Sequence, residues 1–173
     1  MVTNWIHPTP GNYIPYQKTY FDQVPPGNLV QIMNDNRDQL VQWLEQQNEN
    51  FGDFRYASDK WTVKEVMNHI NDTERIMAYR ALTFARGDLS ELPGFEQDDY
   101  VMAAPISEFG LKQLTQEFIS IREASISLIT TFNDELIARK GIANGSVITV
   151  NALCYVIAGH AIHHFNILKE RYS

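Results

Sequence analysis

The chain has 173 residues, of which 44% are hydrophobic and 12% aromatic, and its formal net charge is −7. This length favours a single domain, and the apolar content excludes a disordered chain. The negative charge and the lack of a lysine or arginine cluster argue against nucleic acid and anionic membranes as partners. With no membrane-spanning stretch, no secretory signal and one cysteine, Cys154, we expect a cytoplasmic protein without an internal disulfide.

Residues 1–27 are predicted to form an extended N-terminal arm, because they contain five of the seven prolines. Proline removes a backbone donor and disfavours helix at the residue before it. Five aromatic side chains in the same segment indicate that the arm packs against a surface, either its own domain or a second subunit. Residues 28–173 are expected to form one domain.

Four segments beyond the arm have an apolar repeat of about 3.6 residues, which predicts amphipathic helices. The expected helices cover residues 28–47, 62–86, 107–132 and a last segment that begins between 146 and 149 and ends at 171. Thr62 and Glu65 form a capping box at the start of the second helix. The β-branched residues that open the last segment also suit a strand, but the length of that segment favours a helix.

The connections between these helices differ in length. Residues 48–61 and 133–146 are expected to be moderate loops, whereas residues 88–106 form a connection of a length that is uncommon in compact domains. Four helices of this length predict an all-α four-helix bundle with a long crossover between the second and third helices.

Three of the five histidines lie on inward-facing stripes of the predicted helices. His160 and His164 are four residues apart and so share one face of the last helix, and His69 lies on the apolar stripe of the second. Buried imidazole nitrogens need partners, which a divalent metal ion would supply. Three histidines without a nearby thiolate are typical of an open site that leaves a position for water. The alternative is a set of core histidines that form hydrogen bonds within the protein.

Three further residues are weaker candidates for a catalytic role. His163 can act as a proton shuttle, although a place at the bundle edge or at a subunit contact explains it better. Arg80 lies near the stripe of His69 and can bind an anionic substrate group or a buried carboxylate. Asp98, on the long connection, can act as a general base, although solvated loop charge is the commoner explanation.

Several stretches of the sequence resemble the DinB/YfiT-like family. Residues 61–82, with His69, resemble its second helix, and residues 159–172, with Gly159-His160-Ala-Ile-His163-His164, resemble its last helix. Residues 84–88 and 93–100 resemble the connection found in one branch of the family. The resemblance implies a four-helix bundle with a long crossover, often a homodimer, and a divalent metal ion bound by three histidines.

The histidines that match this motif are His69, His160 and His164, and all-imidazole ligation suits zinc, nickel, iron or copper. Of these we expect zinc, nickel or iron. The resemblance further implies either a metal-dependent hydrolase with a small-molecule substrate or a transferase that uses a low-molecular-weight thiol such as bacillithiol or mycothiol. The alternative class is a metal- or ligand-binding stress-response protein without catalytic turnover.

Overall fold

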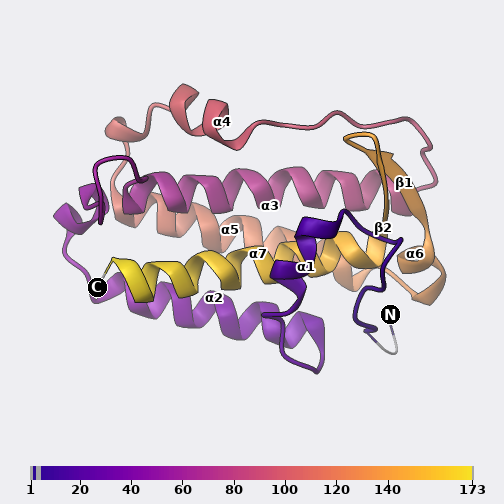
Figure 1. Ribbon diagram of the computed structural model, residues 1–173. Coiled ribbons are helices and arrows are strands. Elements are labelled where there is room, and N and C mark those ends of the chain that lie inside the picture. Colours follow the sequence, from indigo (N-terminus) through magenta and orange to yellow (C-terminus); the bar gives the residue numbers. More distant parts are fainter. Residues whose placement is uncertain (1, 3–4, 173) are drawn as a thin grey trace.

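The computed structural model describes residue 2 and residues 5–172. Four long helices, α2 (Leu29–Glu45), α3 (Val63–Ala85), α5 (Leu111–Thr130) and α7 (Val150–Arg171), lie side by side (Figure 1). Helices α2 and α3 each pack against both α5 and α7, so they lie diagonally across the bundle from one another. The predicted all-α four-helix bundle is confirmed. Met1, Thr3 and Asn4 of the predicted arm and Ser173 of the predicted bundle domain lie outside the described residues.

Helices α2, α3 and α7 each follow a residue whose side chain accepts from one of the first free N–H groups, namely Asn28, Thr62 and Thr149. The predicted capping box is present at α3, where Thr62 accepts from the N–H of Glu65 and the Glu65 carboxylate accepts from the N–H of Thr62. Helix α5 begins at Leu111, later than predicted, because a 3₁₀ turn η3 (Ile106–Glu108) precedes it. Its first N–H, that of Leu111, donates to the carboxylate of Glu49 from the distant 3₁₀ turn η2 (Glu49–Asp53).

The predicted long crossover joins α3 to α5 and runs along the outside of α3 (Figure 1). It contains one short helix, α4 (Gln97–Ala103), which packs against α3. At its start, Leu92 donates to the carbonyl of Ile142 and accepts from the N–H of Asn144, at 2.9 and 3.0 Å. These bonds fix the start of the crossover to the opposite end of the bundle from η3.

A hairpin replaces part of the predicted loop and the predicted start of the last helix. After a short helix, α6 (Asp134–Ala138), strands β1 (Lys140–Ala143) and β2 (Ser146–Thr149) pair antiparallel. Asn144 and Gly145 both have positive φ, which is the requirement of a two-residue hairpin turn of type I′. The rejection of a strand for the β-branched residues before Val150 was therefore wrong, because the hairpin turn makes a four-residue strand sufficient.

The arm folds against its own bundle. It contains a 3₁₀ turn η1 (Pro15–Gln17) and a one-turn helix α1 (Lys18–Phe21), so the prediction of an extended conformation was wrong for these residues. Helix α1 packs on α7, and the side chain of Phe21 is fully buried. A Cβ atom at Gly159 of α7 would collide with the backbone oxygen of Tyr20. Glycine at this position therefore allows α1 to lie directly on α7.

The core consists of two apolar clusters that follow one another along the bundle. On α7 the first cluster ends at Ala158 and the second begins at Ala161. Each long helix places a buried polar side chain at the boundary, namely Asn36 on α2, Glu74 on α3, Arg122 on α5 and His160 on α7. The candidate site lies at this polar layer. Within the described residues, no helix is long and apolar enough to cross a membrane.

Candidate metal centre

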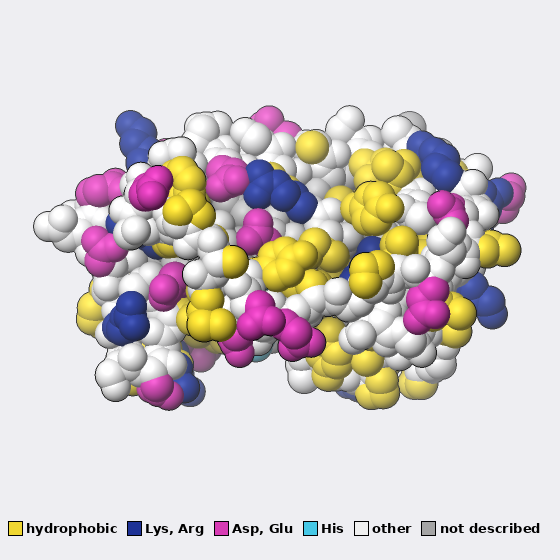
Figure 2. Space-filling view, turned by 90° about the horizontal axis from the view of Figure 1, so that it is seen from above, with side chains coloured by type: hydrophobic (Ala, Val, Ile, Leu, Met, Phe, Trp, Pro, Cys, Tyr) yellow, Lys and Arg dark blue, Asp and Glu magenta, His cyan; other side chains and the backbone are white. Residues whose placement is uncertain are grey.

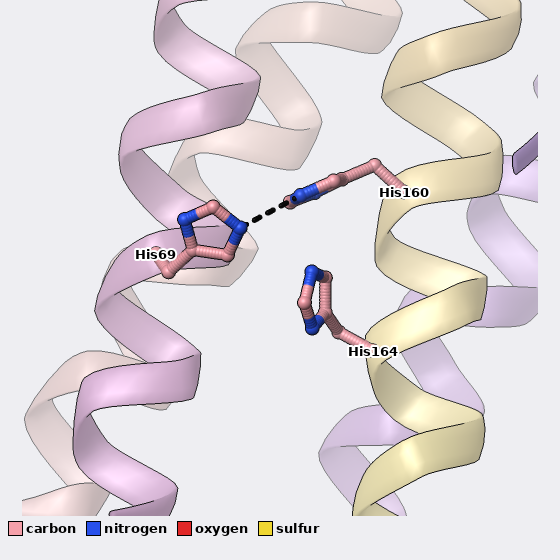
Figure 3. A group of neighbouring side chains, drawn as sticks. All are labelled: His69, His160 and His164. Carbon is pink, nitrogen blue, oxygen red and sulfur yellow. Dashed lines mark hydrogen bonds between the residues drawn. The ribbon is translucent and has the colours of Figure 1, made fainter. Parts of the chain in front are cut away.

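Helices α3 and α7 bring His69, His160 and His164 together, with their rings pointing toward one another (Figure 3). We call these residues the histidine triad. The ring nitrogens that could bind a metal all lie within 4.8 Å of one another, and Nε2 of His69 is 2.9 Å from Nε2 of His160. His69 and His160 are buried, and His164 is partly exposed at the rim. The structure thus shows the predicted convergence of the three side chains.

The spacing of the triad suits a single metal ion. Zinc–nitrogen bonds of about 2.0–2.1 Å place two ligand nitrogens of a tetrahedral site roughly 3.3 Å apart. The observed separations, from 2.9 Å for one pair to at most 4.8 Å, bracket that value. Small rotations of the side chains would bring all three nitrogens to bonding distance, so the residues fit the metal that the sequence predicts.

The electrostatics of the triad favour neutral imidazoles. Burial lowers the pKa of His69 to about 4, and the neighbouring His163 adds to the effect. Burial also lowers the pKa of His160 and of His164 well below the ordinary value, with a second contribution from the other imidazoles. Within the described part of the chain no carboxylate pairs with any of the three. At pH 7 all three rings are therefore in the form that binds a metal ion.

Aromatic side chains from outside the two helices enclose the triad. The ring centroids of Trp61 and His69 are 4.9 Å apart, and those of Tyr20 and His160 are 5.2 Å apart. Tyr20 belongs to α1, so the arm contributes directly to the wall of the site. On the face that carries the crossover, hardly any histidine surface is visible among the hydrophobic and acidic side chains (Figure 2). The triad thus lies below the molecular surface on that side.

The structure places His163 beside the triad, not in it. Its Nδ1 lies 2.8 Å from the amide nitrogen of Gln23, and the amide oxygen of Gln23 accepts from Asn166. Because the Gln23 NH₂ group donates, Nδ1 of His163 accepts, and the ring proton of the neutral form is on Nε2. His163 therefore connects α7 to the arm, which agrees with its predicted place at the edge of the bundle.

The other two candidates lie outside the triad. Asp98 is exposed in the first turn of α4 and does not belong to the group of possible metal ligands. Arg80 is buried on α3, where its guanidinium donates to the carbonyl of Pro93 at 2.6 Å and lies 5.9 Å from the centre of the Phe95 ring. Burial lowers the pKa of Arg80, and the hydroxyls of Tyr16 and Tyr100 counter this effect.

Sequence reasoning missed a buried ion pair next to the site. Arg122 on α5 donates two N–H groups to the carboxylate of Glu74 on α3, with its closest contact at 2.7 Å, and a third to the carbonyl of Met33 on α2 at 3.2 Å. The exposed fractions of the two side chains are 0% and 2%. One signal was available, since Arg122 follows Phe118 by four residues and so interrupts the apolar stripe of α5.

Comparisons with known proteins agree with this fold. The model of the DinB superfamily matches residues 15–168. No curated protein matches the sequence. Among solved structures, the chain is similar to YfiT from Bacillus subtilis, described as "a probable metal-dependent hydrolase with an unusual four-helix bundle topology". The TM-score is 0.75 at 14% sequence identity, over 95% of this chain and 90% of that one. Because the family model spans both histidine-bearing helices and nearly the whole bundle, the chain belongs to the DinB superfamily.

Proposed function

We propose that this chain is a metal-dependent hydrolase whose divalent metal ion is bound by His69, His160 and His164. The convergence of three neutral imidazoles, with ring nitrogens within 4.8 Å and no carboxylate paired with them in the described part of the chain, carries the proposal. Among the described residues, one hydrogen bond links the triad, between the Nε2 atoms of His69 and His160, so nitrogen lone pairs remain available to a metal ion. The fold shared with YfiT, itself described as a probable metal-dependent hydrolase, supports the same conclusion.

The donor set favours a catalytic site over a structural one. Structural zinc sites usually have four protein ligands, whereas three histidines leave a position for water or substrate. A divalent ion held there would lower the pKa of a bound water toward neutrality and polarise the bond to be cleaved. Zinc, nickel and iron all accept three imidazoles, so the ion must be named by elemental analysis.

The protein's own residues supply the ligand geometry and the low-polarity surroundings. Trp61 packs on the ring of His69 and Tyr20 on that of His160, so both rings are held in place and shielded from bulk water. Exclusion of water strengthens every electrostatic interaction within the site. The arm and the segment before α3 are therefore part of the proposed active site.

A two-step experiment tests this proposal. Metal-loaded protein is screened against esters, amides and phosphoesters, and separately against electrophiles in the presence of low-molecular-weight thiols. The baselines are the metal-free protein and the His160→Ala variant. We expect metal-dependent hydrolysis that is lost in His160→Ala. Thiol conjugation without hydrolysis would reassign the site to a transferase, and a loaded site with both panels negative would leave a metal-binding protein without turnover.

A further inference from the structure

We infer that the substrate site extends from the histidine triad along α3 to Arg80, and that it takes a small molecule with an oxyanion, such as a carboxylate, about 10 Å from its reacting group. This inference rests on the proposed function, since it places the reacting group at the triad. It rests on two buried polar groups of α3: Arg80, which uses only part of its donor capacity, and Thr73, whose hydroxyl finds no partner among the described residues.

Arg80 is a buried cation with no ion pair to any described residue. Its side chain is only 6% exposed, and within residue 2 and residues 5–172 no carboxylate pairs with it. Its partners are the Pro93 carbonyl and the weakly accepting Sδ of Met77, at 3.9 Å. A guanidinium has five N–H donors and suits the two oxygens of a carboxylate, so most of its capacity is unused. Burial of an unpaired charge is unfavourable, and an anionic ligand would remove that cost.

The guanidinium faces back toward the triad. Arg80 follows His69 by eleven residues, which at 100° per residue places it within about 20° of the same helix face and about 16 Å farther along the axis. Its contact with Met77, three residues earlier, shows that the side chain lies over the preceding turn. The charged group is therefore roughly 10 Å from the His69 ring, within the span of a small organic molecule.

Thr73 provides an independent indication between these two points. It lies one turn after His69, its side chain is 4% exposed, and its hydroxyl has no hydrogen-bond partner among the residues that the structure describes. A buried hydroxyl without a partner is uncommon in native proteins. A polar atom of a ligand that spans from the triad to Arg80 would pass beside it.

Two tyrosines of the arm, Tyr20 and Tyr16, extend from the triad in a chain of ring contacts. The Tyr20 ring contacts His160, and the Tyr16 ring contacts Tyr20 with centroids 6.3 Å apart. Tyr16 is also close enough to Arg80 to act on its pKa. Aromatic rings thus lie beside the metal ligands at one end of this interval, which favours a ligand with an apolar spacer.

The test uses metal-loaded protein and a series of alkyl hydroxamates with a terminal carboxylate, each compared with the matching primary amide. The hydroxamate binds the metal, and the number of methylenes sets the distance to the terminal group. We expect the carboxylate to bind about tenfold more tightly than the amide, with a maximum near a spacer that matches the ~10 Å interval. Titration calorimetry gives both dissociation constants without any need for turnover.

Variants then assign the preference to Arg80. In Arg80→Gln the dissociation constants of the carboxylate and the amide should agree within about twofold, while the amide binds as tightly as it does to the parent. In Arg80→Lys, which keeps the charge but loses the forked geometry, the preference should be intermediate. Arg75→Gln is the matched control, because Arg75 is exposed on the same helix and paired with Glu117. It should keep the full preference.

The possible failures are distinct. If carboxylate and amide bind equally to the parent at every spacer length, the inference is wrong while the metal site stands. If the preference is present in the parent and survives in Arg80→Gln, another cation provides it and the assignment to Arg80 is wrong. If no hydroxamate of either kind binds the metal-loaded parent, both the proposed function and the inference built on it fail.

Discussion

Two buried polar clusters lie side by side in the middle of this bundle, and they differ in whether the protein completes them. Glu74 and Arg122 neutralise one another through short bidentate contacts, and the Met33 carbonyl takes a further N–H of the guanidinium. The histidine triad, one turn earlier on α3, has three neutral rings and one internal hydrogen bond among them. The ion pair is fully buried and finds its partners within the protein, whereas the triad, with His164 partly exposed, has nitrogen atoms still available to a ligand.

This difference separates a structural role from a binding role. Removing one partner of a satisfied ion pair leaves an unpaired charge, so such a pair makes the fold dependent on both members. Substituting one of a group of ligand atoms removes no internal ion pair, but it removes the stabilisation that the bound ligand would add. We therefore expect substitutions in the ion pair to change mainly stability, and substitutions in the triad to change mainly metal binding.

The largest stability effect is expected for Arg122→Met. The substitution leaves the Glu74 carboxylate buried without a partner, which should lower the free energy of unfolding by about 3–5 kcal/mol in urea denaturation. The double variant Arg122→Met/Glu74→Leu removes both charges and should recover most of that loss. A single variant within about 1 kcal/mol of the parent would contradict a structural role for the pair.

The burial of the triad should appear as a pH dependence of the stability of the metal-free protein. The pKa of His69 is lowered from 6.5 to about 4, so between these values the unfolded chain binds a proton that the folded one does not. Stability must then fall as the pH falls, by about 1.6 kcal/mol between pH 6.5 and 5 for this residue alone. Denaturation curves at several pH values measure the slope, which should be shallower in His69→Leu. An unchanged slope in that variant would show that His69 is not buried in its neutral form.

A smaller effect is expected where the arm meets the bundle. Gly159→Ala places a methyl group against the backbone oxygen of Tyr20, so α1 must move away from α7. We expect a loss of about 1–3 kcal/mol, reduced by the better helix propensity of alanine. Limited proteolysis should show faster cleavage within residues 15–28, and parent-like cleavage would mean that the arm is not held by this contact.

The smallest effect is expected at the start of α3. Thr62→Ala removes a capping side chain about two helix turns before His69 and should cost about 1 kcal/mol, whereas Thr62→Ser keeps the hydroxyl and should cost little. Both variants should bind metal like the parent, which elemental analysis checks. Loss of metal in Thr62→Ala would mean that the triad depends on the exact position of the first turn.

The sequence was sufficient for the features that depend on local patterns. The 3.6-residue repeat located the four long helices, the Thr62–Glu65 capping box located the start of α3, and the i, i+4 spacing put His160 and His164 on one face. An inward stripe on each of two helices was enough to predict that His69 would meet them. That these residues bind a metal ion stays a prediction.

The features that sequence reasoning missed depend on distant partners. Glu74 and Arg122 are 48 positions apart, and neither position alone indicates which residue it meets. The start of α5 is set by Glu49, 62 positions away, and the arm bends into α1 because α7 offers a glycine to receive it. The hairpin is different, because Asn144-Gly145 is a local signal that outweighs the helical length of the segment.

Elemental analysis by mass spectrometry tests the central claim most directly. The parent, purified without added metal, is compared with His69→Ala/His164→Ala and with His163→Gln, a control on the same helix that lies beside the triad. The account predicts close to one zinc, nickel or iron per chain in the parent and in His163→Gln, and none in the double variant. A parent that holds no metal even after incubation with each ion would contradict the account and leave the triad as a polar part of the core.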